Sequence, residues 1–221
     1  MSDTPWADVD RYLVDLLHPR DDALEHAMEA STAAGLPPIA VTPPGGKLLH
    51  ILARLIGARR ILEVGTLAGY STIWLARAAG KEGLVTTLEL DEKHAEVAAA
   101  NIAYAGLSST VDIRLGRAAD TLAGIHAEGG PPYDMIFIDA DKASIPVYFT
   151  WALRLSRPGS LILVDNVIRN GAVIDASSTD PNIIGVRRFN EMLASEPRVT
   201  ATTIQTVGAK GYDGMTFAIV N

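Results

Sequence analysis

The fold is decided by the stretch Arg60-Ile61-Leu62-Glu63-Val64-Gly65-Thr66-Leu67-Ala68-Gly69-Tyr70-Ser71. Its apolar run at 61–64 is long enough for one buried parallel strand. The run breaks at Gly65, and a helical pattern begins at Tyr70. A strand, a glycine turn and a helix N-terminus together predict a nucleotide site, because exposed backbone N–H groups and the helix dipole attract polar or anionic ligands.

The spacing of the glycines differs from that of a dinucleotide-binding turn. Gly65 and Gly69 do not form the G-x-G-x-x-G pattern, and Glu63 adds an acid beside the turn. An acid facing the turn favours a ligand with a cationic end, such as the amino group and sulfonium of S-adenosylmethionine. The alternative is an ordinary strand-to-helix turn with a solvated glutamate, and these residues alone leave it open.

The composition narrows the class of protein. At 221 residues the chain is one domain, or one domain with a cap, and its net charge of −7 with dispersed lysines and arginines gives no reason to expect nucleic acid or an anionic membrane as a partner. The absence of cysteine excludes disulfides, thiolate zinc sites and a cysteine nucleophile. The first residues do not resemble a signal peptide and no apolar run is long enough to span a bilayer, so we expect a cytoplasmic protein.

Residues 1–57 predict a helical layer without strands. Apolar residues at helical spacing predict a helix over 5–17, and a second helix runs to Ala34 and ends at Gly35. Four prolines and two glycines in 36–46 predict a loop, and a helix over 48–56 follows. We expect this layer to cap the ligand-binding end of the sheet or to form a dimer contact.

Residues 58–221 alternate between strand and helix patterns, which is typical of a parallel sheet covered on both faces. Two last apolar runs, with Gly208, Gly211 and Gly214 between them, predict an antiparallel hairpin. The whole chain, 1–221, is therefore predicted to be a single α/β domain with a Rossmann-like seven-stranded mixed sheet. The expected strands are 60–64, 84–90, 111–115, 135–139, 160–165, 199–207 and 215–220, and the expected helices of this part are 70–79, 92–104, 118–127, 145–155 and 183–195.

Four of the predicted strands end in acids: Glu63, Glu89, Asp139 and Asp165. Ligands of open α/β sheets bind beyond the carboxyl ends of the strands, so these acids are expected at one rim. Glu89, at the end of the second strand, stands where an acid accepts both ribose hydroxyls of a nucleotide. Acids gathered after apolar runs predict a cationic or hydroxyl-rich ligand.

The strands ending at Asp139 and Asp165 are predicted neighbours, which brings Asp139, Asp165 and Asn166 together. Two carboxylates and an amide oxygen suit Mg²⁺, Mn²⁺ or Ca²⁺ and do not suit zinc. Lys142 follows Asp139 by three residues, and a nearby dication would favour the neutral amine that a general base requires. The alternative makes Lys142 a salt-bridge partner of Asp139 or Asp141.

These motifs together resemble the cation-dependent class I O-methyltransferases, the family that includes catechol and caffeoyl-CoA O-methyltransferases. The resemblance covers nearly the whole chain, and the order and spacing of its motifs make it specific. The motifs are Val41-Thr42-Pro43, the turn from Glu63 to Ser71, Glu89, Gly116-Arg117-Ala118-Ala119-Asp120, Asp139-Ala140-Asp141-Lys142, Arg157-Pro158-Gly159, Asp165-Asn166 and Gly211-Tyr212-Asp213-Gly214-Met215.

The resemblance implies divalent-metal-dependent methyl transfer from S-adenosylmethionine to a hydroxyl of a catechol-like small molecule, in a homodimer. It implies that Lys142 is the base and that Asp139, Asp165 and Asn166 hold the metal, most simply Mg²⁺. Two departures, Ile145 and Arg169, stand on the acceptor side and leave the acceptor undefined. The residues implied to contact the cofactor are Val41, Glu63, Gly65, Thr66, Ser71, Glu89, Ala118 and Asp139.

Three other functions fit parts of the pattern. A methyltransferase of the same fold with a structural acid pair would work without metal. A nicotinamide-dependent oxidoreductase is disfavoured by the missing G-x-G-x-x-G pattern and by Glu63. A non-catalytic nucleotide-binding module is disfavoured because Asp139, Lys142, Asp165 and Asn166 are all present.

Overall fold

The strand predicted at 60–64 is β1 (Arg60–Val64), which lies near the middle of a seven-stranded sheet formed by residues 5–221, the part of the chain that the computed structural model describes. The strand order is β3-β2-β1-β4-β5-β7-β6, with β1 to β5 parallel and β7 antiparallel to both of its neighbours. The predicted Rossmann-like mixed sheet with a terminal hairpin is confirmed. The other strands are β2 (Leu84–Glu89), β3 (Val111–Leu115), β4 (Tyr133–Ile138), β5 (Ser156–Asp165), β6 (Val199–Gly208) and β7 (Gly211–Val220).

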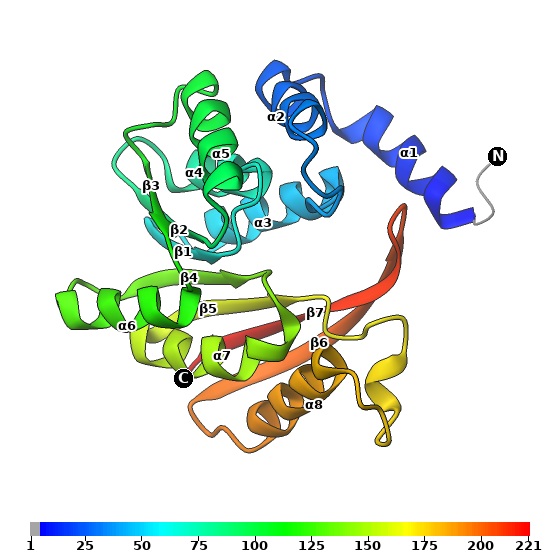
Figure 1. Ribbon diagram of the computed structural model, residues 1–221, viewed down its shortest axis with the longest axis vertical. Coiled ribbons are helices and arrows are strands. Elements are labelled where there is room, and N and C mark those ends of the chain that lie inside the picture. The colour runs from blue at the N-terminus through cyan, green and yellow to red at the C-terminus, as the bar shows by residue number, and fades with distance from the viewer. Residues whose placement is uncertain (1–4) are drawn as a thin grey trace.

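Helices cover both faces of the sheet, with α2 to α5 on one side and α6 to α8 on the other (Figure 1). Alternate residues of β1 serve the two layers: Ile61 packs with α3 and α4, whereas Leu62 packs with α6, α7 and α8. Both side chains are fully buried, which explains the continuous apolar run. The helices are α1 (Pro5–Leu17), α2 (Asp22–Ala33), α3 (Pro43–Leu55), α4 (Tyr70–Ala79), α5 (Glu92–Tyr104), α6 (Ala118–Glu128), α7 (Ile145–Leu155) and α8 (Pro181–Ala194).

Helix α3 begins within the segment predicted to be a loop. Thr42 is its N-cap and accepts a hydrogen bond from the N–H of Gly45 at 3.3 Å, and Pro43 occupies the first turn, where its missing N–H costs nothing. Gly46 is not a turn residue, because a Cβ there would overlap the indole ring of Trp74. The prediction of a loop was wrong for residues 43–46, which form the first turn of α3. Gly46 is needed there for close packing rather than for a turn.

The terminal hairpin is longer and tighter than predicted. Gly208 pairs with Gly211, so only Ala209 and Lys210 form the turn. Gly214, expected in the turn, lies inside β7, where a Cβ would overlap the side chain of Ile168. The hairpin tip reaches α1, where the N–H of Ala209 donates to Asp10 Oδ2 at 2.7 Å (Figure 1).

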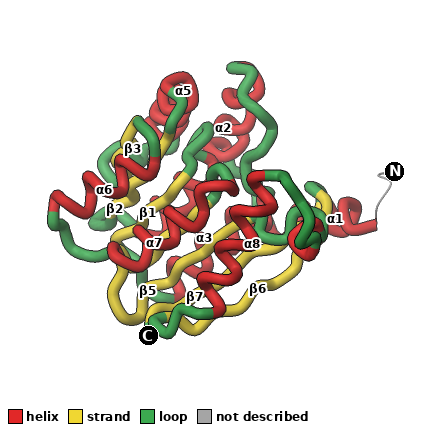
Figure 2. Tube along the Cα trace, turned by 60° about the horizontal axis from the view of Figure 1, so that its bottom comes forward, coloured by secondary structure: helices red, strands yellow, loops and turns green. Residues whose placement is uncertain are grey.

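Strand β5 begins at Ser156, four residues before the predicted start, because Ser156 pairs with Tyr133 across an irregular register. Figure 2 shows the strands crossing the molecule beneath α6, α7 and α8, with α1 projecting at one end. Throughout residues 5–221, every helix is too short or too polar to cross a membrane.

Candidate active site

A cavity of about 840 Å³ opens beyond the carboxyl ends of the parallel strands, where the topology predicts a ligand. The helical layer contributes one wall through Ile39, Ala40 and Val41, as the predicted cap requires. Of the residues singled out in the sequence, those lining the cavity are Val41, Gly65, Thr66, Ser71, Glu89, Ala118, Asp139, Lys142, Asn166 and Arg169. Glu63 and Asp165 are not part of its lining.

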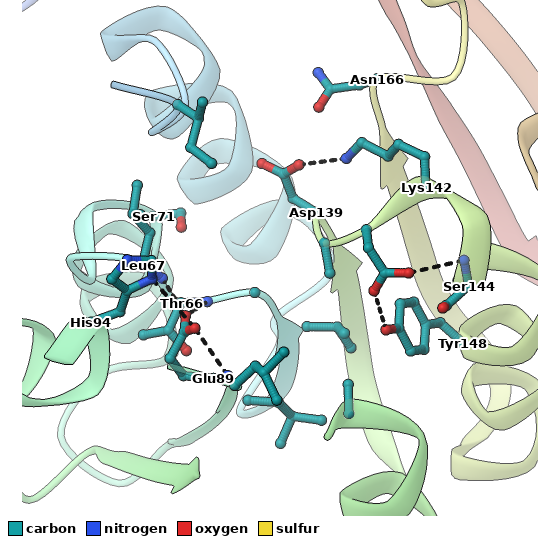
Figure 3. A pocket seen from close by; sticks show the side chains of 18 of the residues that line it. Thr66, Leu67, Ser71, Glu89, His94, Asp139, Lys142, Ser144, Tyr148 and Asn166 are labelled. Atoms are coloured by element: carbon teal, nitrogen blue, oxygen red, sulfur yellow. Dashed lines mark hydrogen bonds and ion pairs between the residues drawn. The ribbon is translucent and has the colours of Figure 1, made fainter. Parts of the chain in front are cut away.

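Glu89 binds the glycine turn to the end of β2. Its Oε2 accepts the N–H groups of Thr66 at 3.2 Å and Leu67 at 2.8 Å, and its Oε1 accepts those of Leu90 and Asp91 at 2.9 and 3.0 Å (Figure 3). The expectation that backbone N–H groups of the turn attract an anion is therefore not met at these two amides, which already donate to a carboxylate. The group that faces the cavity here is the carboxylate of Glu89, which suits a ligand with hydroxyl groups or a cationic end.

Glu63 lies fully buried under the turn. Its Oε2 accepts hydrogen bonds from Thr72 Oγ1 at 2.5 Å and Thr87 Oγ1 at 2.7 Å, while Oε1 has no partner among residues 5–221. Burial raises the pKa of Glu63 to about 7, against the opposing hydrogen bonds from Ser71, Thr72 and Thr87. Since Ser71 lines the cavity, Glu63 is separated from the cavity by one side chain.

Gly65 allows the turn to touch the residues after β4. Its φ is +104°, and a Cβ there would overlap the carbonyl of Asp139. The N–H of Asp139 in turn donates to the carbonyl of Val64 at 2.9 Å. The candidate cofactor turn and the candidate metal-binding segment are thus in direct backbone contact.

Lys142 and Asp139 form an ion pair in the cavity wall, with Nζ and Oδ1 2.8 Å apart and the lysine side chain only 10% exposed (Figure 3). Asn166 lies on the same side, and its φ of +59° turns it out of the line of β5. The register that pairs Ile138 with Val164 places Asp139 next to Asp165 when it is continued by one residue. The structure therefore brings the predicted residues together, and it also contains the salt bridge that the alternative interpretation requires.

The donor set at this rim fits a hard divalent cation. Burial and the charge of Asp139 raise the pKa of Asp165 well above its ordinary value, so two carboxylates crowd one site. A dication between them would relieve that repulsion, and the amide oxygen of Asn166 is a further ligand of the preferred kind. Within residues 5–221 no cluster of three acids or histidines exists that could hold a metal, so this candidate site has two carboxylates and one amide.

Asp141 serves as a local cap of the short helical turn 142–144. Its Oδ2 accepts the N–H of Ser144 at 3.1 Å and its Oδ1 accepts the hydroxyl of Tyr148 at 2.5 Å (Figure 3). Burial and Asp141 together raise the pKa of Tyr148 to about 12, which keeps the phenol protonated. Ile145, by contrast, is fully buried in the core on α7, so the expectation that it shapes the acceptor side was wrong.

Several lining residues were not predicted from the sequence as site residues, and three of them have polar groups that could contact a ligand: His94, Tyr148 and Asn182. His94 could have been found, because its N–H donates to the N-cap Asp91 at 3.1 Å, one turn into a helix whose start was predicted correctly. Tyr148 lies six residues after Lys142, on α7. The sequence of α7 does not show which of its apolar residues face the core and which face the cavity. Asn182 reaches the cavity from α8, a contact that local sequence patterns do not encode.

The chain is similar to known methyltransferases over its full length. A model of the O-methyltransferase family matches residues 18–219. A catechol O-methyltransferase from Niastella koreensis is 56% identical over 220 residues, which cover 100% of both chains. The structure of an O-methyltransferase from Bacillus cereus in complex with SAH has a TM-score of 0.96 at 53% identity and covers 98% of each chain.

A second solved structure agrees with the first. The O-methyltransferase TomG from Streptomyces achromogenes, involved in tomaymycin synthesis and solved in complex with SAM, has a TM-score of 0.96 at 52% identity and covers 100% of this chain and 99% of its own. The match extends over the sheet, the cavity and the N-terminal helices alike. The protein therefore belongs to the O-methyltransferase family and is an enzyme of that class.

Proposed function

We propose that the protein transfers the methyl group of S-adenosylmethionine to one hydroxyl of a catechol-like small molecule, with the help of a divalent cation. The observation that supports this most directly is the arrangement of the cavity. Glu89 and the glycine turn lie at one end, and Asp139, Lys142 and Asn166 lie at the other (Figure 3). A donor and an acceptor bound in one cavity meet between these two ends. The solved relatives in complex with SAM or SAH support the choice of donor.

The cofactor end is built from acids and small residues. Glu89, which lines the cavity at the end of β2, would accept the ribose hydroxyls in place of some of its backbone N–H donors, while Ala118 would face the adenine. Ser71, which is held near Glu63, would face the methionine end together with Val41. Gly65 and Thr66 would form the floor beneath it, and Asp139 would approach it from β4.

At the acceptor end, Lys142 would take the proton of the attacking hydroxyl at Nζ. Lys142 is paired with Asp139, so it can act as a base only when Asp139 is engaged elsewhere. Asp139, Asp165 and Asn166 would hold the cation, most simply Mg²⁺, with Mn²⁺ and Ca²⁺ as alternatives. When bound, such a cation acidifies the chelated hydroxyl and fixes its orientation.

Positioning is the remaining contribution of the chain. The backbone contact between Gly65 and Asp139 fixes the distance between the cofactor turn and the acceptor end. Holding two reactants in near-attack geometry removes much of the entropic barrier of a bimolecular transfer. The buried setting of Lys142 also excludes water from the proton-accepting nitrogen.

We propose in addition that the protein forms a homodimer through α1. None of the residues of α1 is buried, although Val9, Leu13, Leu16 and Leu17 form an apolar stripe along it. These side chains are between 38% and 62% exposed. The apolar face of an amphipathic helix is normally buried, and a contiguous exposed apolar patch is typical of an interaction surface. A second copy of the chain would cover them.

The first test is methyl transfer from S-adenosylmethionine to catechol and to phenol, each with Mg²⁺ and with EDTA. Transfer to catechol alone, abolished by EDTA and restored by Mg²⁺, is expected. Transfer that ignores EDTA would leave Asp139, Asp165 and Asn166 as structural residues and favour the metal-independent alternative. Absence of transfer to any catechol, with cofactor still bound, would overturn the proposed acceptor class.

A further inference from the structure

Arg169 is a lining residue of the cavity that the proposed reaction does not use. It follows β5 by four residues and lines the same cavity as Lys142, Asn166 and Asn182. Its side chain is 35% exposed, so most of it lies within the wall. Arginine at such a position has five N–H donors in a planar fork, which is the geometry that carboxylates accept.

Among residues 5–221, no acceptor satisfies the donors of this guanidinium. The nearest acid is Asp213, whose Oδ2 lies 3.8 Å from Nη1, beyond hydrogen-bonding distance. The Nε atom is buried and has no partner among residues 5–221. A buried donor without a partner costs free energy, and a ligand that accepts from it recovers that cost.

Asp213 cannot move closer to the guanidinium of Arg169, because its other carboxylate oxygen accepts hydrogen bonds from the backbone. Its Oδ1 accepts the N–H groups of Ile168 at 2.9 Å, Arg169 at 3.0 Å and Gly214 at 2.9 Å. These bonds hold the loop in an uncommon conformation, with φ of +55° at both Arg169 and Asn170. The guanidinium is thus held at the cavity wall by its own backbone.

A second cation lies on the same side. Lys210, at the tip of the β6–β7 hairpin, donates through Nζ to the carbonyl of Ala40, which also lines the cavity. Burial lowers the pKa of Lys210, against the opposing charges of Asp139 and Asp165 nearby. Lys142 is already paired with Asp139, whereas the Arg169 guanidinium has a buried N–H group that no residue of 5–221 accepts.

We infer that Arg169 binds a carboxylate carried by the methyl acceptor, so that the preferred substrates are catechols with an acidic substituent. This inference rests on the proposed function, since it names a class of acceptor for the same cavity. Arg169 would donate to the carboxylate through its unsatisfied N–H groups, and Lys210 would add longer-range attraction. The acid group would take no part in the transfer and would serve to orient the ring against Lys142.

The wild-type enzyme provides the first test, which needs no variant. The Michaelis constants of 3,4-dihydroxybenzoate and of its neutral amide, 3,4-dihydroxybenzamide, are compared at low and high salt. We expect the acid to have a constant about tenfold lower, because a hydrogen bond to a charged group contributes more than a neutral one. The advantage should shrink in high salt, since partly exposed charges are screened. Equal constants, or a lower one for the amide, would overturn the inference.

Variants locate the effect on Arg169. Binding of 3,4-dihydroxybenzoate and of 3,4-dihydroxybenzamide is measured by calorimetry in the presence of Mg²⁺ and S-adenosylhomocysteine. The wild type is compared with Arg169→Gln and Arg169→Lys, and Arg188→Gln is the matched control. Arg188 is exposed on α8 and does not line the cavity. The ratio of acid to amide affinity should fall about tenfold in Arg169→Gln, fall less in Arg169→Lys and stay unchanged in Arg188→Gln. An unchanged ratio in Arg169→Gln would refute the role of Arg169.

The two proposals fail in different ways. If no catechol is methylated but the acid still binds in a manner that requires Arg169, the proposed reaction is wrong and the carboxylate site stands. If neutral and acidic catechols are methylated equally well, the reaction stands and the carboxylate site is wrong.

Discussion

The burial of Glu63 disfavours its ionised form, and this makes the stability of the protein depend on pH. The pKa of Glu63 is raised to about 7 in the folded protein, so the folded state keeps a proton that the unfolded state releases above pH 4.5. Unfolding therefore becomes easier as the pH rises from 4.5 to 7, by about 3 kcal/mol at full deprotonation. We predict that Glu63→Gln removes this loss and is more stable than the wild type at pH 8, but not at pH 4.5.

Urea unfolding of the cofactor-free protein in EDTA, at several pH values, measures the difference. Other titrating groups, such as Asp165, are present in both proteins, and their contributions largely cancel when the two free energies of unfolding are subtracted. A difference that stays constant between pH 4.5 and 8 would show that Glu63 is ionised in the folded state.

Lys142 offers a test of the base. Lys142→Arg keeps a cation beside Asp139 but replaces the amine by a group that does not deprotonate in proteins. We predict that kcat falls at least about 100-fold, the usual contribution of a general base, while the affinity for S-adenosylhomocysteine stays within about twofold.

Lys81→Arg, an exposed lysine outside the cavity, is the control for Lys142→Arg. Retention of kcat in Lys142→Arg would assign the lysine to the salt bridge alone. Collapse of cofactor binding would assign it to the structure of the site.

The turn after β1 packs against the segment that follows β4, and Gly65 is the residue that allows this close contact. Gly65→Ala adds a Cβ at a φ of +104° and against the carbonyl of Asp139. We predict a loss of about 2 kcal/mol or more in the free energy of unfolding, together with weaker cofactor binding. Chemical denaturation and calorimetry check the two effects.

Gly124→Ala is the matched control for Gly65→Ala. Gly124 lies within α6 with open space around it, so alanine there should be neutral or stabilising by up to about 1 kcal/mol. Equal effects at the two glycines would mean that the contact with Asp139 carries no special constraint.

The loop after β5 depends on one carboxylate of β7. Asp213→Ala removes the acceptor of three N–H groups, so Ile168 and Arg169 lose their fixed positions. We predict that the Michaelis constant of the acceptor rises about tenfold, while cofactor affinity, which depends on the other end of the cavity, is retained. Asp213→Asn keeps an acceptor oxygen and should restore most of the loss. Failure of asparagine to rescue would point to the charge of Asp213 instead.

The sequence predicts the elements of this fold well where one physical rule dominates. The strand at 60–64 and the helix at 70–79 were predicted with their observed bounds, because apolar runs and helical spacing follow directly from burial. Gly46 and Gly214 were misread as turn residues, since a glycine required by close packing looks the same in the sequence as one required by a turn. Telling them apart needs the position of Trp74 or Ile168, which only the folded chain provides.

The candidate site was predictable for a different reason. Acids at strand ends converge by topology, so Glu89, Asp139 and Asn166 reach one cavity once the strand order is known. The roles of individual acids were harder to assign, because Glu63 lies beneath the cavity and Glu89 already accepts four backbone N–H groups. Burial and competing hydrogen bonds are properties of the assembled site.

The apolar stripe of α1 predicts how the protein associates. We expect the wild type to be a dimer in light scattering coupled to size-exclusion chromatography, and Leu13→Glu with Leu17→Glu to be a monomer, because charges would stand in a buried contact. Arg11→Glu, on the opposite side of the helix, changes the charge by the same amount and should remain a dimer. A monomeric wild type at all concentrations would refute the dimer, and a dimeric double variant would place the contact elsewhere.

The position of β7 has a consequence for how the protein is made. This strand is the last to leave the ribosome, yet it lies between β5 and β6 in the finished sheet. Until residues 211–220 emerge, the nascent chain holds β5 with one edge unpaired, and an unpaired edge recruits other chains. A chain whose synthesis stops before residue 211 would therefore expose this edge and aggregate. Residues 211–220 decide whether the edge of β5 is covered or free to bind other chains.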